Sequence, residues 1–147
     1  MPELPEMENY KLLLNNLIAG KMITAVTIQR EKSINVPVDE FTATVTNQTI
    51  TSISRRAKYI IFHLQNGMCL LLHLMLGGWM FYGKDEDKPK RTVQVRLSFG
   101  DQHLHFIGLR LGYLHLLSPE QVQNELEKNW VLSHFIQVSH SQHFNSD

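Results

Sequence analysis

The chain has 147 residues, and its 14 basic and 14 acidic side chains balance, so no global attraction to a polyanion is expected. A content of 43% hydrophobic and 19% charged residues is typical of one globular domain with a substantial core. The sequence has neither a long apolar run nor a basic leader, which predicts a cytoplasmic protein with no membrane partner. A single cysteine, Cys69, excludes a disulfide framework and is expected to be a buried core thiol.

The first predicted element is an amphipathic helix that begins at about Pro5 and ends before Gly20. Its apolar residues recur at three- and four-residue spacing and are expected to face the core: Met7, Tyr10, Leu13, Leu14, Leu17 and Ile18. Glu3 and Glu6 are three residues apart and lead into the same face. Both carboxylates are therefore expected at the body of the domain.

From residue 22 onward the apolar period changes to two, which predicts about eight short strands. These strands are expected at 22–29, 48–54, 58–65, 68–74, 79–83, 92–99, 102–107 and 113–117. A short helix is predicted over 38–46, and a last helix from the cap residue Ser118 to about residue 128. The pattern predicts an α+β fold, mainly β: an antiparallel β-sandwich or flattened barrel with an N-terminal and a C-terminal helix.

The first residues carry a chemical signal. Removal of Met1 makes Pro2 an N-terminal secondary amine, and an α-amino group titrates at about 7.7–8.0, so part of it is a nucleophile at pH 7. With a sugar aldehyde such an amine forms an iminium that has no nitrogen proton to lose, which suits bond breaking at an abasic deoxyribose. Glu3 beside it is a candidate proton donor. Proline and glutamate are also ordinary residues at a helix start, so both interpretations stay open from these residues alone.

Two inner motifs have similar alternatives. Strand alternation places Arg56 and Lys58 on one face and Arg55 on the other, where the pair is suited to phosphates but is more often a solvated strand face. The stretch 73–78, rich in leucine and methionine and ending in two glycines, fits either an apolar wedge into DNA or a core strand followed by a turn.

His103 and His105 are expected on one strand face, but two ligands without a third at suitable spacing do not define a zinc site. The sequence therefore predicts neither a metal site nor a cofactor in this chain.

The N-terminal string Pro-Glu-Leu-Pro-Glu-Met-Glu resembles the start of the formamidopyrimidine-DNA glycosylase / endonuclease VIII family. Three further segments match motifs of that family in the same order: 55–59, 73–78 and 109–112. The resemblance runs from residue 1 to about 128 and implies an N-terminal catalytic β-sandwich domain of a bifunctional DNA glycosylase and abasic-site lyase. It implies damaged double-stranded DNA as the partner of a monomeric, nucleoid-associated protein.

The resemblance also implies roles for individual residues. Pro2 is expected to attack the sugar C1′ to form a Schiff base, and Glu3 to donate and shuttle protons. Glu6 is expected to support the site, and Lys58 to lie near the damaged sugar. Arg56 is a candidate phosphate contact on the same strand face.

The two remaining motifs correspond to DNA-inserting loops in the family. In 73–78, Leu76 matches the inserted methionine of the family's His-Leu-Gly-Met-Ser-Gly, while Met75 replaces its glycine. Both Leu76 and Met75 are therefore candidates for the inserted residue. In 109–112, Arg110 keeps the phosphate-contacting arginine of Arg-Arg-Phe-Gly. Leu109 and Leu111 replace the base-reading arginine and the inserted ring, so strict recognition of the opposite base is not expected.

The run 84–91 mixes basic and acidic residues and is expected to be a surface loop. Arg91 and Thr92 occupy the region where many relatives have a DNA-contacting histidine, so Arg91 is a candidate replacement. The sequence shows no likeness to the family's helix-two-turn-helix and zinc-finger domains, and 129–147 reads as a polar tail.

Because the likeness to the family ends at about residue 128, an alternative function is a catalytically impaired remnant that binds DNA weakly. A single-base slip near residues 128–129 is one hypothesis for the tail, because the frame one base earlier must encode Leu-Gly across Asn129-Trp130-Val131. The codons of this segment test the hypothesis.

Overall fold

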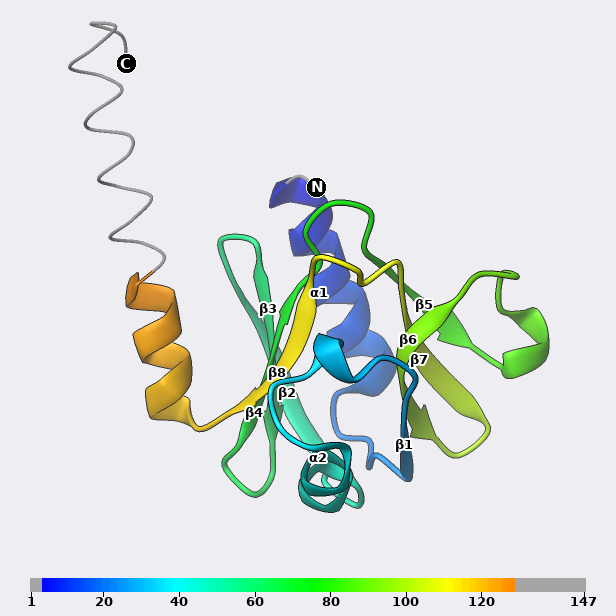
Figure 1. The fold of residues 1–147 in the computed structure, drawn as a ribbon, viewed down its shortest axis with the longest axis horizontal. Coiled ribbons are helices and arrows are strands. Elements are labelled where there is room, and N and C mark those ends of the chain that lie inside the picture. Colours follow the sequence, from blue (N-terminus) through cyan, green and yellow to red (C-terminus); the bar gives the residue numbers. More distant parts are fainter. Residues whose placement is uncertain (1–3, 129–147) are drawn as a thin grey trace, which may run out of the picture.

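The computed structural model describes residues 4–128 and contains two four-stranded antiparallel sheets. The first has the order β1-β6-β7-β5 and the second the order β2-β3-β4-β8 (Figure 1). The strands are β1 (Ala25–Ile28), β2 (Ile50–Arg56), β3 (Tyr59–Leu64), β4 (Cys69–His73), β5 (Trp79–Gly83), β6 (Val93–Phe99), β7 (Gln102–Ile107) and β8 (Tyr113–Leu117). The predicted antiparallel sandwich is confirmed.

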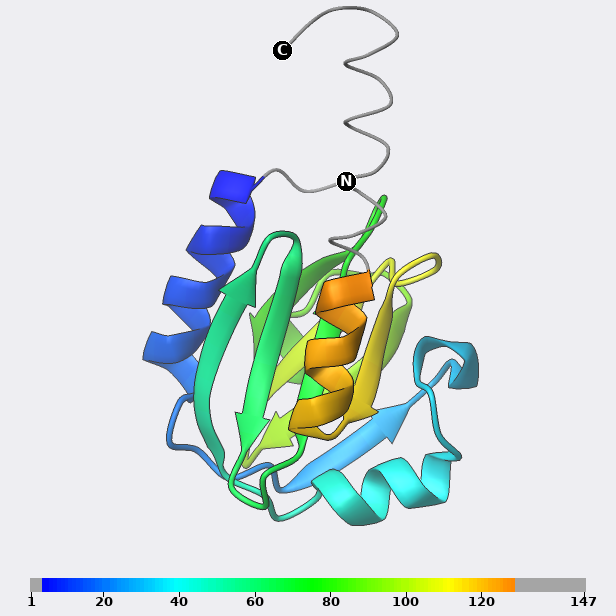
Figure 2. The ribbon, with the colours of Figure 1, turned by 90° about the vertical axis from the view of Figure 1, so that its left-hand side faces the viewer.

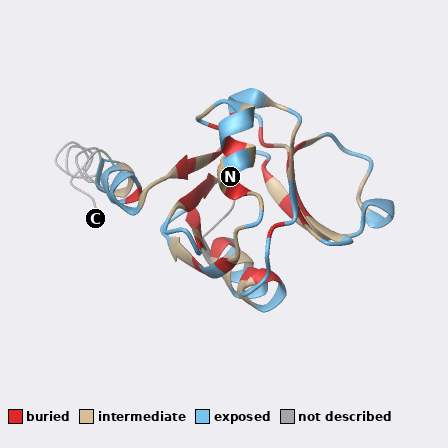
Figure 3. Ribbon diagram, turned by 90° about the horizontal axis from the view of Figure 1, so that it is seen from below, coloured by how far each residue is buried: buried red, intermediate tan, exposed pale blue. Residues whose placement is uncertain are grey.

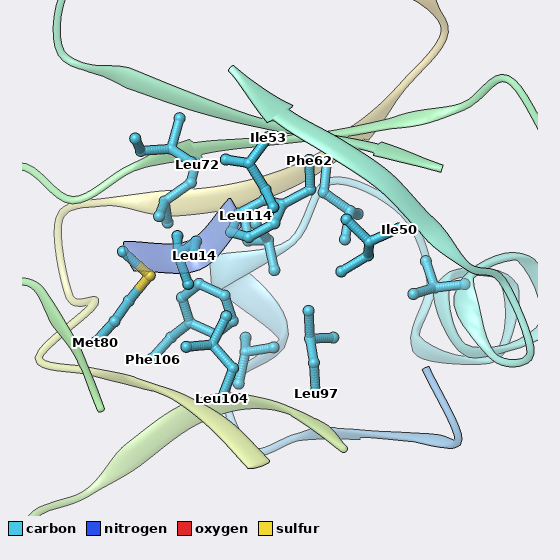
Figure 4. Close-up of a cluster of buried hydrophobic side chains, with 14 of the residues drawn as sticks. Leu14, Ile50, Ile53, Phe62, Leu72, Met80, Leu97, Leu104, Phe106 and Leu114 are labelled. Atoms are coloured by element: carbon cyan, nitrogen blue, oxygen red, sulfur yellow. The ribbon is translucent and has the colours of Figure 1, made fainter. Parts of the chain in front are cut away.

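The core lies between the two sheets. Strand alternation points one set of apolar side chains inward from each sheet, and these sets meet in the middle (Figure 4). Phe62 of β3 and Phe106 of β7 form an edge-to-face pair across the gap, with ring centroids 6.2 Å apart. Buried stretches of chain lie inside, and exposed stretches lie on the turns and helix surfaces (Figure 3).

Helix α1 (Leu4–Ile18) covers an open side of the sandwich (Figures 1 and 2). Its buried apolar residues are Met7, Leu14 and Ile18. The side chain of Asn15 ties the helix to β2, since its amide donates to the Ile53 carbonyl at 2.8 Å and its oxygen accepts from the Ile53 N–H at 3.1 Å.

The expected core face of α1 is wrong at two positions. Leu13 and Leu17 are exposed, as is the neighbouring Leu12. Helix α1 packs mainly against β2, so only a narrow stripe of its surface is covered. The spacing of apolar residues along α1 predicted a wider buried face than the one that packs against β2.

The short helix α2 (Val38–Val45) confirms the prediction for that segment and buries Phe41 and Val45. The last described helix, at 119–128, begins as predicted: the Gln121 N–H donates to the Ser118 hydroxyl, and the Gln121 side-chain oxygen accepts from the Ser118 N–H. It packs Val122 on the outer face of the second sheet, in a cluster that includes the buried Cys69. The predicted burial of that thiol is confirmed.

Two short 3-10 turns, η1 (Glu31–Ser33) and η2 (Asp85–Asp87), complete the fold. None of the helices among residues 4–128 is long and apolar enough to cross a membrane. The tail at 129–147 lies outside the described residues.

Candidate nucleic-acid interface

Four segments far apart in sequence gather at one end of the sandwich (Figures 1 and 2). They are the first turn of α1, the β2–β3 turn at 57–58, the β4–β5 loop at 74–78 and the β7–β8 loop at 108–112. Antiparallel pairing brings them together, because β2–β3, β4–β8 and β5–β7 all have the strand ends adjoining these segments on the same side.

The loops 74–78 and 108–112 pack backbone against backbone. A Cβ atom on Gly108 would overlap the carbonyl oxygen of Gly77, and one on Gly112 would overlap the carbonyl oxygen of His73. Gly108 also has a φ of +68°, which an L side chain rarely adopts. Glycine is therefore required for the two loops to approach this closely.

Buried hydrogen bonds fix the second loop from below. The Leu109 N–H donates to the Gln94 side-chain oxygen at 2.9 Å, and the Ser33 hydroxyl donates to the Leu109 carbonyl at 3.3 Å. The Leu109 side chain belongs to the core and is 0% exposed. The loop is thus anchored on a core residue with both of its backbone polar groups satisfied.

The tips of the two loops are apolar and exposed. Leu76 is 67% and Leu111 is 63% exposed, the largest values among the exposed large hydrophobic residues described. Met75 is half-buried and has a φ of +53°, a left-handed conformation that costs a non-glycine residue about 1–2 kcal/mol. This conformation accounts for the glycine of the motif that the loop resembles, and it leaves Leu76 as the projecting residue.

An open pocket of about 430 Å³ lies beside these tips. We call it the loop pocket; its lining is Leu76, Gly77, Lys90, Arg91, Thr92, Gln94, Ile107, Gly108 and Arg110. Three of these described residues are cationic and none is acidic. The chain therefore carries a local positive patch although its net charge is zero.

The β2–β3 turn contributes two more exposed cations, Arg56 and Lys58. Arg55 points the other way, as predicted, and donates to the Glu8 carboxylate at 2.7 Å and to the Ala57 carbonyl at 2.7 Å. Hydrogen bonds from Lys11 and Arg55 lower the pKa of Glu8. Burial and, to a smaller extent, the charge of Lys58 lower the pKa of His73, so that lysine lies near the end of β4.

The model of the formamidopyrimidine-DNA glycosylase N-terminal domain matches residues 1–114. The chain belongs to this glycosylase family. Its relatives include the formamidopyrimidine-DNA glycosylase of Lactiplantibacillus plantarum, 41% identical over 93 residues that cover 63% of this chain and 34% of that protein. The enzyme of Cytobacillus firmus is 35% identical in an alignment that covers 100% of this chain and 53% of the relative. The chain thus spans about a third to a half of these relatives.

Solved structures of the glycosylase family share the fold. The Lactococcus lactis formamidopyrimidine-DNA glycosylase bound non-covalently to DNA containing an AP site superposes with a TM-score of 0.78 and 28% identity, covering 86% of this chain and 49% of that chain. The same enzyme in complex with DNA containing FAPY-dG gives a TM-score of 0.79, 27% identity, and coverage of 86% and 48%.

The residues expected to form the glycosylase site are only partly within the described structure. Lys58, Leu76, Arg91 and Arg110 lie at the same end of the sandwich as the first turn of α1. Pro2 and Glu3 lie outside the described residues.

The expected position of Glu6 against the body of the domain is wrong, because the residue is exposed. Its expected role in supporting the site stays a prediction. The adjacent Met7 takes the core-facing position in the first turn of α1. Glu6 therefore projects into solvent at the end where the loops gather.

Lys90 and Gln94 of this interface were not predicted from the sequence, and Thr92 was placed in the region without a contact of its own. Lys90 and Thr92 line the loop pocket, and Gln94 holds its wall through the Leu109 N–H. Lys90 lies in a run of mixed basic and acidic residues, and this pattern did not indicate that its side chain faces the same pocket as Arg91. A register shift in the β6–β7 pairing between Val93 and Val95 buries Gln94, and strand alternation does not reveal such a shift.

Proposed function

We propose that this chain is the catalytic N-terminal domain of a DNA glycosylase that removes damaged bases from double-stranded DNA and cleaves the resulting abasic site. The observation that carries the proposal is the loop pocket, which joins three cations and an exposed apolar tip at the end where α1 begins. Family membership and the DNA-bound relatives support the same function.

In this proposal Pro2 is the nucleophile. Its amine bonds to C1′ of the damaged nucleotide as the bond from C1′ to the base breaks, and Glu3 donates the proton that the opening sugar ring or the departing base requires. The iminium then acidifies the C2′ proton. Loss of that proton and departure of the 3′ phosphate complete the elimination, and water releases Pro2.

Lys58 and Arg110 act on the DNA backbone at this end. Lys58 is exposed in the β2–β3 turn and assists the sugar chemistry as a second acid or as a phosphate contact. Arg110 projects from the loop 108–112 into the lining of the loop pocket and holds a phosphate there. Arg56 and Arg91 extend the same cationic surface.

Leu76 and Leu111 provide the wedge. A base can reach the nucleophile only after it leaves the stack, and apolar side chains replace part of the stacking that is lost. The interlocked loops present the two leucines in a fixed relation before DNA arrives, so little ordering is needed on binding.

Leu109 bears on specificity. A leucine side chain has no hydrogen-bonding group to read a base, and Leu109 is also 0% exposed within the core. We therefore propose that this protein discriminates weakly between the bases opposite the lesion.

A second candidate is a non-catalytic domain that binds DNA weakly. The observation that favours it is the loop pocket itself, which is open to solvent and has three cations among its described lining residues. Fewer phosphate contacts would lower both the affinity and its salt dependence.

Borohydride trapping distinguishes the two candidates. Protein shown by mass to begin at Pro2 is mixed with abasic-site duplex, and the covalent adduct is quantified beside Pro2→Gly and Glu3→Gln variants. An adduct that requires Pro2 supports the enzyme. Folded protein that begins at Pro2 and gives no adduct supports the non-catalytic domain.

A further inference from the structure

The outer face of the first sheet holds a second pocket, distinct from the loop pocket, whose lining includes charged and polar residues. The segment 84–92 connects β5 to β6 and projects at the side of the molecule, where η2 forms its turn (Figure 1). A pocket of about 280 Å³ lies between this segment and strands β1, β6 and β7. We call it the outer-face pocket; its lining is Thr27, Gln29, Asp85, Lys88, Thr92, Val93, Arg96 and His105.

His105 has an unusual environment in this pocket. Leu104 and Phe106 point into the core, so His105 lies on the outer face of β7, where a side chain is ordinarily exposed. It is nevertheless 0% exposed, and both of its ring nitrogens lack a hydrogen-bond partner among the described residues. Nε of Arg96 is also buried and unpartnered within the described part of the chain. Buried polar atoms of natural proteins are nearly always paired, so three such atoms at one pocket indicate a polar occupant.

The chemistry of the lining selects an anion. Lys88 and Arg96 carry two positive charges, and Thr27 and Thr92 supply hydroxyl donors. Asp85 is the single carboxylate of the lining, and Nη1 of Arg96 already binds both of its oxygens, at 2.8 and 2.7 Å. A phosphate group, which accepts several hydrogen bonds and favours arginine and lysine, matches this set of donors.

A metal ion fits the outer-face pocket poorly. The imidazoles of His103 and His105 lie 3.7 and 3.9 Å from the Asp85 carboxylate, but no group of three ligating side chains among the described residues is placed to hold a metal. The guanidinium of Arg96, bound to the same carboxylate, further disfavours a cation.

The outer-face pocket adjoins the loop pocket. Thr92 lines both, and Lys90 and Arg91 of the loop pocket directly precede it in the chain. A strand whose backbone crosses the loop pocket therefore has a second cationic site next to its path.

We propose that the outer-face pocket is an oxyanion site that binds a phosphate group, and that in function it takes a backbone phosphate of the DNA held at the loop pocket. The assignment of DNA as the source rests on the proposed function, whereas the oxyanion chemistry rests on the outer-face pocket alone. Occupancy would also fix the 84–92 segment and thereby the position of Lys90 and Arg91.

Inorganic phosphate tests the oxyanion site without DNA. In ¹⁵N-labelled chain 1–147, phosphate is expected to shift the signals of Arg96 Nε–H and the His105 ring saturably, while chloride at equal ionic strength does not. A bound phosphate favours the protonated imidazole, so the pKa of His105 should rise on binding. The charged or titratable groups facing that ring are Asp85, His103, Arg96 and Lys88.

A matched pair of lysines supplies the control. Lys88→Ala removes a lining cation and should weaken phosphate binding about tenfold. Lys84→Ala removes an equal charge from the same segment but from outside both pockets, and should leave phosphate binding unchanged. Shifts that do not saturate, or equal effects of the two substitutions, would overturn the oxyanion site and leave water as the occupant.

The DNA arm identifies the source of the phosphate. If the outer-face pocket takes a backbone phosphate, Lys88→Ala should reduce the slope of log affinity against log salt by about one, and Lys84→Ala should not. Saturable phosphate binding with equal slopes in both variants would support the site and overturn DNA as its source. If the unsubstituted chain fails to bind DNA, the proposed function fails while the phosphate titration still decides the site.

Discussion

The loop pair 74–78 and 108–112 and the segment 84–92 meet at the loop pocket but are held by different forces. The loop pair rests on close backbone packing between Gly77 and Gly108 and on the buried hydrogen bond from the Leu109 N–H to the Gln94 side chain, and none of these groups is charged. The 84–92 segment rests on the Asp85–Arg96 ion pair, whose carboxylate side chain is 49% exposed. Salt should therefore change the position of the apolar tips less than it changes that of the cations Lys90 and Arg91.

The largest expected effect comes from breaking the loop packing. Gly108→Ala adds a Cβ against the Gly77 carbonyl in a left-handed backbone, and should lower the free energy of unfolding by about 3 kcal/mol in urea denaturation. Gly100→Ala is the control, because Gly100 has a φ of +81° but open space around it and should cost only about 1 kcal/mol. Equal costs would show that the loops do not interlock.

The exposed tips should behave in the opposite way. Leu76→Ala is expected to change the free energy of unfolding by less than about 0.5 kcal/mol, because Leu76 is exposed, yet to weaken binding of abasic-site duplex about tenfold. Leu12→Ala on α1 removes a similarly exposed leucine away from the loops and serves as the control. Fluorescence anisotropy measures the DNA affinity of both variants. Equal losses of affinity would contradict the proposal that Leu76 inserts into the DNA.

Acid should weaken the fold through buried histidines. Burial lowers the pKa of His73, at the base of the loop pair, and of His105, beneath the 84–92 segment, as it does for His63 and His115. The unfolded chain then binds more protons below about pH 6.5, so stability is full above that pH and is lost as the pH falls toward the folded values. Urea midpoints measured between pH 7.5 and 5 should decline, and a constant or rising midpoint would contradict this environment.

The smallest effect is expected at the ion pair. Burial opposes ionisation of Asp85, but its hydrogen bonds and attraction to Arg96 outweigh that effect and lower the pKa of the carboxyl. The pair therefore contributes above about pH 4 and is lost as the pH falls further. Asp85→Asn should cost less than about 1 kcal/mol at pH 7, and the cost should shrink in high salt. A cost that does not depend on salt would show that the 84–92 segment, like the loop pair, is held by uncharged contacts.

Local sequence signals predicted most of the fold. Alternating apolar residues predicted all eight strands, with bounds within a few residues of those observed. Ser118 marked the start of the last helix, where it exchanges hydrogen bonds with Gln121. Burial of Cys69 followed from its apolar strand. These features depend on neighbours in the sequence, which is why the sequence alone specifies them.

The candidate site was predictable only where a motif marked it. The motifs identified Leu76 and Arg110, but they did not reveal that Gly108 packs against Gly77 or that Gln94 supports Leu109. These contacts join residues from different strands. The sequence wrongly predicted that Leu13 is buried, and it did not predict that His105 is fully buried. In both cases the burial of the side chain depends on whether another segment of the chain covers it.

The central claim is that the end of the sandwich carrying the loop pair binds DNA. The direct test is an amide chemical-shift map of the ¹⁵N-labelled chain titrated with a short abasic-site duplex. Shifts are expected only in the first turn of α1 and at 56–58, 74–78, 90–92 and 108–112, extending along 84–89 if the outer-face pocket takes a phosphate. Shifts centred on the opposite turns at 65–67 and 100–101 would contradict it.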